Sequence, residues 1–229
     1  MKGTPHDHRL LIGLTGMYCA GKNRVATLLE ARGFPVLDVD TLGHQGIERA
    51  QEAILERFGT GILGKDGSID RKLLGAQVFG SPEALAWLET IVHPAANRLT
   101  EEWIHRQGDR PCVINAALLH RSSVFHQLDG IILVKAPGLT RLLRARKRDK
   151  LPWGQLIQRF RCQREFMAKY LTEPADIYNI SNRGYGRFGS SFFRGSLERQ
   201  LEVALTQLGM VKDAYPVEER LNQKWRSPN

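Results

Sequence analysis

A glycine-rich segment, Gly16-Met17-Tyr18-Cys19-Ala20-Gly21-Lys22-Asn23, is the strongest indication of fold class in this chain. It follows Leu10–Thr15, an apolar run that predicts a buried strand, and it leads into Lys22–Arg32, where apolar residues recur at helical spacing. It matches the phosphate-loop pattern G-x-x-x-x-G-K-[ST] except at its last position. Glycines let backbone N–H groups converge on phosphate oxygens, and Lys22 can reach the β- and γ-phosphates beside the positive end of the helix. The stretch therefore predicts a binding site for a nucleoside triphosphate.

Individual positions in this loop carry further expectations. The predicted nucleotide contacts are Gly16, Cys19, Ala20, Gly21, Lys22, Asn23 and Arg24. Asn23 replaces the Ser or Thr whose hydroxyl ligates magnesium, and its amide oxygen is a weaker ligand for that metal. Arg24 can add positive charge near the α-phosphate. Cys19 lies among basic groups at a helix N-terminus, which predicts a lowered thiol pKa and raised reactivity, although an inert small residue is the competing interpretation.

Further strands and helices extend this start into an alternating pattern. Apolar runs predict strands at Phe34–Val39, Cys112–Ile114, Gly130–Val134 and Ile177–Ile180. Helical spacing predicts a helical region from Gln45 to Gln107, two basic helices at Leu139–Lys150 and Trp153–Leu171, and a last helix at Leu197–Leu208. Within the helical region Ser81 is expected to cap a helix that starts at Pro82. The pattern predicts an α/β fold with a parallel sheet and a helical insert.

Two carboxylates end the second predicted strand, in Asp38-Val39-Asp40. Ligands of open α/β sheets bind at the carboxyl ends of strands, so both acids can face such a site. There they can position magnesium or accept the proton of an attacking hydroxyl. The alternative is a helix N-cap followed by a surface acid. Aromatic residues nearby in the insert, Phe58, Trp87 and Trp103, fall on helical stripes and are predicted to be core.

An ordered series of short motifs resembles the dephospho-coenzyme A kinase family over Ile12–Gly184. Besides the loop and Val36–Asp40, the motifs are Phe58-Gly59, Asp66-Gly67, Asp70-Arg71, Phe79, Leu88-Glu89, His93-Pro94, Arg144, Arg148-Asp149, Gln163, Lys169, Ala175-Asp176 and Ile180–Gly184. The resemblance implies a P-loop kinase core in residues 8–210. Residues 41–108 are then the helical acceptor-binding insert, 149–173 the lid helices, and 211–229 a polar tail.

The resemblance also implies an activity and roles for residues. The activity is ATP-dependent phosphorylation of the ribose 3′-hydroxyl of dephospho-coenzyme A, with magnesium. Asp40 is the expected base, Lys22 and Arg148 the other catalytic residues, and Asp38 an acceptor-positioning or magnesium-organising residue together with Asn23. The resemblance places Arg71 and His93 in acceptor binding, although His93 could equally cap a helix turn. It places Arg144 and Asn182 with the nucleotide.

Several positions depart from the family pattern, and they keep alternatives open. Besides Asn23, the usual Pro-Leu-Leu-x-Glu reads Ala117–Arg121, the acid ahead of it is Asn115, and a common arginine is His44. One alternative is a nucleotide-binding protein without transfer chemistry, and another is a kinase of a different small nucleotide-like acceptor. A third, a nucleic-acid-binding module built on the basic helices, is disfavoured because few aromatic platforms interleave with the basic residues.

Composition sets the remaining expectations. The chain has 229 residues, 42% of them hydrophobic and 25% charged, which is typical of a globular protein with its own core. Its formal charge of +9 suits an anionic partner. No apolar run is long enough to cross a bilayer, and the three cysteines show no paired spacing, so we expect a cytoplasmic protein without membrane or nucleic-acid partners. The oligomeric state is left open, a monomer included.

Overall fold

The structure, a computed structural model, describes residues 9–78, 81–160, 176–183 and 192–210. Predictions about Phe79, Gln163, Lys169, Ala175, Gly184, the lid beyond residue 160 and the tail 211–229 lie outside these ranges. The chain divides into two units. The sheet unit comprises Met1–Val36, Asp109–Arg121 and Phe125–Asn229, and the helical unit comprises Leu37–Gly108 with Ser122–Val124.

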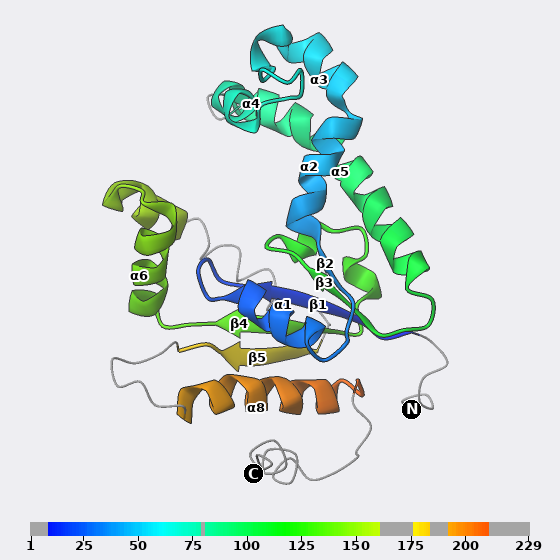
Figure 1. The fold of residues 1–229 in the computed structure, drawn as a ribbon, viewed down its shortest axis with the longest axis vertical. Helices are drawn as coiled ribbons and strands as arrows, with labels where there is room; N and C mark the ends of the chain where they lie inside the picture. Colours follow the sequence, from blue (N-terminus) through cyan, green and yellow to red (C-terminus); the bar gives the residue numbers. More distant parts are fainter. Residues whose placement is uncertain (1–8, 79–80, 161–175, 184–191, 211–229) are drawn as a thin grey trace, which may run out of the picture. The chain divides into compact units, whose positions relative to one another are not determined.

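Five strands form one sheet in the order β2-β3-β1-β4-β5 (Figure 1). Their bounds are β1 Leu11–Gly16, β2 Val36–Asp38, β3 Cys112–Asn115, β4 Gly130–Lys135 and β5 Ile177–Ser181. β1 pairs in parallel with β3 on one side and β4 on the other, and β4 pairs in parallel with β5. The predicted parallel sheet is confirmed. Strand β2 is shorter than predicted because the chain turns into a helix directly after Asp38.

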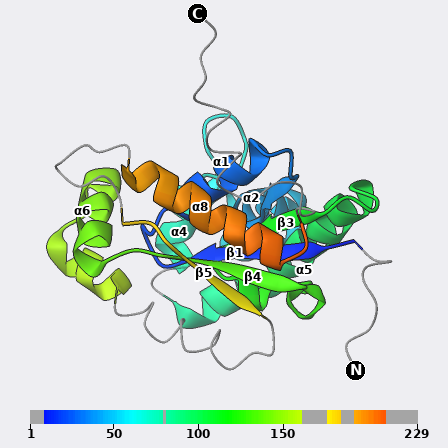
Figure 2. The ribbon, with the colours of Figure 1, turned by 90° about the horizontal axis from the view of Figure 1, so that it is seen from below.

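The strands are apolar at consecutive positions because both faces of the sheet are covered. Helices α1 (Lys22–Glu30) and α8 (Phe192–Gln207) cover one face, and their buried leucines, Leu29, Leu201 and Leu205, pack with Ile12 and Leu14 of β1. Figure 2 shows α8 running across the strands. On the opposite face Gly13 admits the 3-10 turn η2 (Leu119–Arg121), since a Cβ at Gly13 would lie 2.5 Å from the Leu119 side chain.

A basic helical arm follows β4. Helix α6 (Gly138–Asp149) ends where Lys150 adopts a left-handed φ of 54°, and residues 153–160 are helical again after Pro152. We call residues 138–160 the arm. The predicted break at Pro152 is confirmed for these residues. In the parts of the chain that the structure describes, no helix combines the length and the apolarity needed to span a lipid bilayer.

The helical unit contains α2 (Val39–Arg49), α3 (Gln51–Phe58), α4 (Arg71–Val78) and α5 (Pro82–Arg106). Helices α2 and α5 lie side by side (Figure 1), and Gly46 permits this approach because a Cβ there would lie 3.1 Å from Val92. Ser81 caps α5 as predicted, its hydroxyl accepting the Ala84 N–H at 3.1 Å. Phe58 and Trp87 meet edge to face at 5.6 Å in this unit's small core, which confirms their prediction as core residues.

Candidate active site

The phosphate loop joins β1 to α1 in a geometry that leaves no room for side chains at its glycines. A Cβ at Gly16 would lie 2.9 Å from the Val134 carbonyl oxygen, and Met17 donates its N–H to that oxygen at 3.2 Å. The turn then passes through two left-handed residues, Cys19 with φ 58° and Gly21 with φ 94°. Helix α1 begins at the next residue, Lys22. The first-turn N–H groups of a helix have no partner within the helix, so this end of α1 suits an anion.

Two polar side chains from distant parts of the chain brace this turn. The buried Asn182 donates its Nδ2 to the Ala20 carbonyl oxygen at 2.8 Å, and Arg144 donates Nη1 to the same oxygen at 3.1 Å. Arg144 also donates Nη2 to the Asn182 carbonyl oxygen at 3.3 Å. Burial lowers the pKa of the Arg144 guanidinium, which nevertheless stays charged at neutral pH. Both residues lie at the loop and contact its carbonyl oxygens; their predicted contact with a nucleotide stays a prediction.

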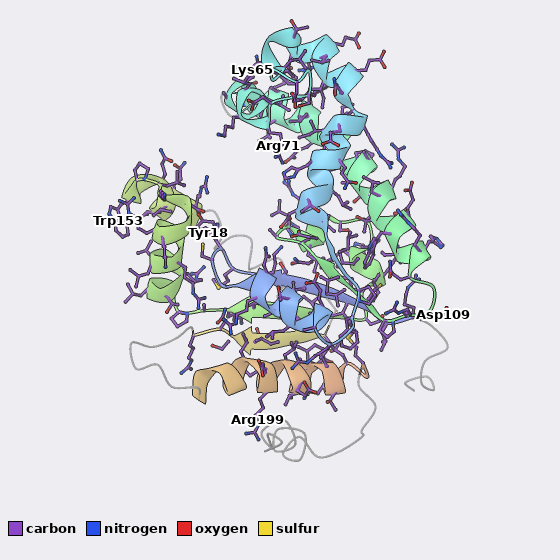
Figure 3. The ribbon with its side chains drawn as sticks, viewed as in Figure 1. Tyr18, Lys65, Arg71, Asp109, Trp153 and Arg199 are labelled. Carbon is purple, nitrogen blue, oxygen red and sulfur yellow. The ribbon has the colours of Figure 1, made fainter. Side chains whose placement is uncertain are left out.

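The end of α6 meets the loop through Tyr18. The Tyr18 hydroxyl donates a short hydrogen bond to Asp149 Oδ2, and the Arg148 guanidinium lies 5.1 Å from the centre of the tyrosine ring. Figure 3 shows Tyr18 between the loop and α6. Arg148 in turn makes a two-point ion pair with Asp149, with Nε 2.7 Å from Oδ1 and Nη2 3.2 Å from Oδ2. Arg148, predicted as a catalytic residue, is therefore held close to the phosphate loop.

The thiol of Cys19 behaves differently from the prediction. Burial raises the pKa of Cys19, and this effect outweighs the lowering by the nearby guanidiniums of Arg148, Arg144, Arg141 and Arg159. The predicted low pKa is wrong because burial in the folded chain raises it, and sequence neighbours alone do not reveal that burial. Burial therefore favours the protonated thiol over the reactive thiolate.

Sequence reasoning gave no role to Arg141 and Arg159, whose charges act on Cys19 of the loop, although helical spacing could have indicated the first. Arg141, Arg144 and Arg148 recur at spacings of three and four, so they share one face of α6. Arg141 lies 4.8 Å above the Phe160 ring, and burial lowers the pKa of its guanidinium. Arg159 donates Nη1 to the Tyr18 hydroxyl oxygen at 3.3 Å. The contribution of Arg159 depends on the fold of the arm and has no local signature.

The two predicted carboxylates belong to the helical unit and differ in their surroundings. Asp38 ends β2 and is the N-cap of α2, its Oδ1 accepting the Asp40 N–H at 3.2 Å. Asp40 lies in the first turn of α2 with an exposed side chain. The predicted strand Phe34–Val39 thus runs one residue too far, because the Asp38 side chain caps a helix that begins at Val39. Capping engages one oxygen of Asp38 and leaves the Asp40 carboxylate outside the cap.

The remaining predicted acceptor residues also lie in the helical unit. Arg71 opens α4 and is exposed, directly after Asp70, whose carboxylate caps the helix by accepting the Lys72 N–H at 2.8 Å (Figure 3). His93 is half-buried in the interior of α5, which continues through Pro94 to Arg106. The alternative that His93 caps a helix turn is therefore wrong. Acceptor binding by Arg71 and His93 stays a prediction.

Asn115 ends β3, directly beside β1. Its side chain is buried, with 2% exposure, and its Oδ1 has no hydrogen-bond partner within the described part of the chain. Strand alternation puts Asn115 on the same face as Val113, which packs in the core beneath α1. A buried acceptor without a partner is costly, so this oxygen suits a ligand that arrives at the loop. In the described ranges no three acidic, histidine or cysteine side chains gather as metal ligands.

The residues that form this site fall within a match to a known protein family. The model of the dephospho-CoA kinase family matches residues 10–182, from β1 to the loop-bracing Asn182. The chain belongs to the dephospho-CoA kinase family. A dephospho-CoA kinase of Halalkalibacterium halodurans is 36% identical over 176 residues, which are 74% of this chain and 88% of the relative. One of Treponema pallidum is 32% identical over 211 residues, 88% of this chain and 96% of the relative.

Solved structures support the fold. The Thermus thermophilus protein TT1252 superposes with a TM-score of 0.70 at 32% identity, covering 88% of this chain and 99% of that one. A dephospho-CoA kinase from Campylobacter jejuni, at 21% identity and a TM-score of 0.58, covers 87% of this chain and 97% of that one and supports the fold. The P-loop kinase fold predicted from the sequence is therefore confirmed, and membership of a dephospho-CoA kinase family makes the chain a kinase.

The altered stretch Ala117–Arg121 keeps a structural role in this family member. Leu119 is fully buried against Gly13, and the Ala117 carbonyl oxygen accepts the Thr15 hydroxyl at 3.4 Å. The stretch therefore still packs under β1 although its family motif is lost. Another departure, His44, is exposed on α2.

Proposed function

We infer that this chain transfers the γ-phosphoryl group of ATP to the ribose 3′-hydroxyl of dephospho-coenzyme A, giving coenzyme A and ADP. The observation that carries this conclusion is the family match over residues 10–182, which spans the braced phosphate loop and both predicted carboxylates. Phosphoryl transfer needs little covalent chemistry from a protein; it needs the reacting groups positioned and the developing charge stabilised. The residues of the site suit those two tasks.

The nucleotide side of the reaction falls to the loop and the arm. Backbone N–H groups at the start of α1 and the ammonium group of Lys22 bind the β- and γ-phosphates. Arg144 and Asn182 hold the Cys19–Gly21 turn in shape through its carbonyl oxygens. Arg148 supplies positive charge to the phosphoryl group during transfer, when negative charge builds on its oxygens. We place Gly16, Ala20, Asn23 and Arg24 in the same nucleotide site.

The acceptor side falls to the helical unit. Asp40 accepts the proton of the attacking 3′-hydroxyl, because its carboxylate is exposed in the first turn of α2 and is not the one that caps the helix. Asp38 holds that turn in place and helps to position the acceptor. Arg71 and His93 contribute positive charge and hydrogen bonding to the anionic acceptor. Both carboxylates follow the carboxyl end of a strand, where ligands of α/β sheets bind.

Magnesium is implied by ATP-dependent transfer, and the donor set fits an ion that arrives with the nucleotide. Asn115 presents a buried oxygen without a partner in the described structure, and Asn23 offers an amide oxygen in the first turn of α1. Neutral oxygens alone hold a hard cation weakly, so the phosphates must supply the charged ligands. When bound, magnesium neutralises charge on the β- and γ-phosphates. Asn23 and Asn115 are the residues that we propose to hold it, with Asp38 as a further candidate.

A cytoplasmic location is the compartment that we propose for this reaction. Cys19 and Cys112 are free thiols in the described structure, as expected in a reducing environment. Fractionation of cells that produce the chain tests this location, and recovery in an oxidising compartment would contradict it.

The decisive experiment replaces Asp40 by Asn. An amide keeps the shape of the side chain but cannot take the proton, so turnover with dephospho-coenzyme A should fall by about 10²–10⁴-fold. The dissociation constant of ATP should change little, because the phosphate loop, and not Asp40, binds ATP. Asp109→Asn is the matched control, since Asp109 is also an exposed acid and belongs to the sheet unit. Unchanged turnover in Asp40→Asn would reassign the base to Asp38. A parent protein that binds ATP but phosphorylates nothing would support the non-catalytic alternative, and transfer to a different nucleotide would support the other kinase.

A further inference from the structure

Tyr18 joins the phosphate loop to the arm, and no role above accounts for its side chain. Its hydroxyl donates to Asp149 Oδ2 and accepts from Arg159 Nη1 at 3.3 Å. Its ring meets the Phe160 ring edge to face at 5.5 Å. One side chain of the loop therefore touches both the end of α6 and the helical residues after Pro152.

Arg148 is held from two directions by the same group of residues. The carboxylate of Asp149 binds it at two points, which fixes the plane of the guanidinium. The Tyr18 ring lies 5.1 Å from its central carbon, a cation–π distance. Asp149 engages two N–H groups of Arg148, and a guanidinium has five. The other N–H groups can therefore bind a phosphate while the carboxylate keeps its hold.

The pairing of Arg148 with Asp149 stabilises both side chains. The Arg148 side chain is 60% exposed, and a free arginine side chain must lose rotamer entropy before it is fixed. Asp149 is only 16% exposed at the C-terminal end of α6, where the helix dipole disfavours a carboxylate. The Asp149 carboxylate accepts a hydrogen bond from the Tyr18 hydroxyl and makes ion pairs with the guanidiniums of Arg148 and Arg159.

We propose that Tyr18 and Asp149 are positioning residues that hold Arg148 over the phosphate loop, oriented for the phosphoryl group in transfer. The proposal rests on the role assigned to Arg148 under the proposed function. Tyr18 fixes Asp149 through its hydroxyl, and Asp149 fixes the guanidinium plane. Because Tyr18 is itself part of the loop, the orientation of Arg148 is tied to the loop that binds the phosphates.

The first test measures Tyr18→Phe in the parent protein and in an Arg148→Ala background. Loss of the hydroxyl removes a hydrogen bond to a charged group, so kcat should fall by about tenfold while KM for ATP stays within about twofold. In the Arg148→Ala background Tyr18→Phe should have no further effect on kcat. Tyr178→Phe, the same change on β5, is the matched control and should leave kcat unchanged in both backgrounds. Thermal melting and circular dichroism check that each variant is folded.

A second measurement removes the acceptor from the test. Binding of ADP with aluminium fluoride, which imitates the planar phosphoryl group, should weaken by about tenfold in Tyr18→Phe and in Asp149→Asn, whereas binding of ADP alone should not change. A merely structural role would weaken both complexes equally. Because no acceptor is present, this result stands even if dephospho-coenzyme A is the wrong acceptor.

Three outcomes overturn the proposal. Equal losses from Tyr18→Phe with and without Arg148 would show that Tyr18 acts independently of it. A rise in kcat in Tyr18→Phe would show that the contact restrains Arg148 at rest and does not position it for transfer. Full activity in Arg148→Ala would remove the role of Arg148 and with it the need for positioning residues. A parent protein that lacks transfer to dephospho-coenzyme A, yet shows the expected analogue binding, would overturn the proposed acceptor alone.

Discussion

Replacing Gly21 by Ala should destabilise the phosphate loop more than the same change at a glycine whose added Cβ would meet no other atom. Gly21 has φ 94°, and a Cβ there would lie 2.2 Å from Asn182 Nδ2, far inside contact distance. Left-handed backbone costs a residue other than glycine about 1–2 kcal/mol. In addition Asn182 must move, which breaks its bonds to Ala20 and Arg144, each worth about 0.5–1.5 kcal/mol. We expect a total loss of about 2–5 kcal/mol in the free energy of unfolding.

Gly33→Ala separates the two contributions. Gly33 also has a left-handed φ, 84°, but no heavy atom lies within 4 Å of a Cβ built there. It should therefore lose only the backbone contribution, about 1–2 kcal/mol. In an Asn182→Ala background, Gly21→Ala should likewise show only that contribution, because the obstructing amide is gone. The difference in the free energy of unfolding between these variants measures the contribution of the hydrogen bonds that Asn182 makes to the loop and to Arg144.

Urea denaturation and ATP calorimetry provide the assay. Displacement of Asn182 removes its hydrogen bond to the Ala20 carbonyl oxygen, so the dissociation constant of ATP should rise by at least about tenfold in Gly21→Ala. In Gly33→Ala the dissociation constant should equal that of the parent. Equal stability losses in Gly21→Ala and Gly33→Ala, with unchanged ATP affinity, would refute the idea that Asn182 and Arg144 shape the loop.

Three further outcomes are expected at the loop. Lys22→Ala should abolish ATP binding or transfer with the fold retained, since the ammonium group of this half-buried residue is expected to bind the phosphates; full transfer activity in this variant would contradict the loop assignment. Asn23→Ser should lower the magnesium concentration needed for half-maximal rate, because a hydroxyl is the better ligand, and identical magnesium titrations would place Asn23 outside the metal shell. Because burial raises the pKa of Cys19, less thiolate is present at neutral pH, so iodoacetamide should react slowly at pH 7 and faster as the pH rises through the raised value. Alkylation at Cys19, scored against Cys19→Ala, that reaches half its maximal rate below about pH 8.5 would contradict this reasoning.

Residues close together in the sequence determined the parts of the site that depend on local backbone geometry. The spacing of Gly16, Gly21 and Lys22 between an apolar run and a helical stripe was enough to place a phosphate loop at the junction of β1 and α1. Local patterns also gave the parallel strands and the cap at Ser81, because strand alternation and capping involve neighbours only a few residues apart. The predicted second strand ran one residue past Asp38, since an Asp can either continue a strand or cap a helix and both interpretations suit the same letters.

The contacts that hold the site together join residues more than a hundred positions apart, so they became visible only in the folded chain. Asn182 reaches Ala20 across 162 residues, and Asp149 reaches Tyr18 across 131. Nothing in the sequence around Cys19 shows that its thiol is covered, so its raised pKa followed from the folded chain alone. Helical spacing shows that Arg141, Arg144 and Arg148 share a face, but which one braces the loop and which one pairs with Asp149 depends on how α6 packs. Local sequence was therefore enough to predict the phosphate loop and its backbone geometry, whereas the packing of the sheet unit fixed which side chains hold the loop, because hydrogen bonds and burial depend on distances in space.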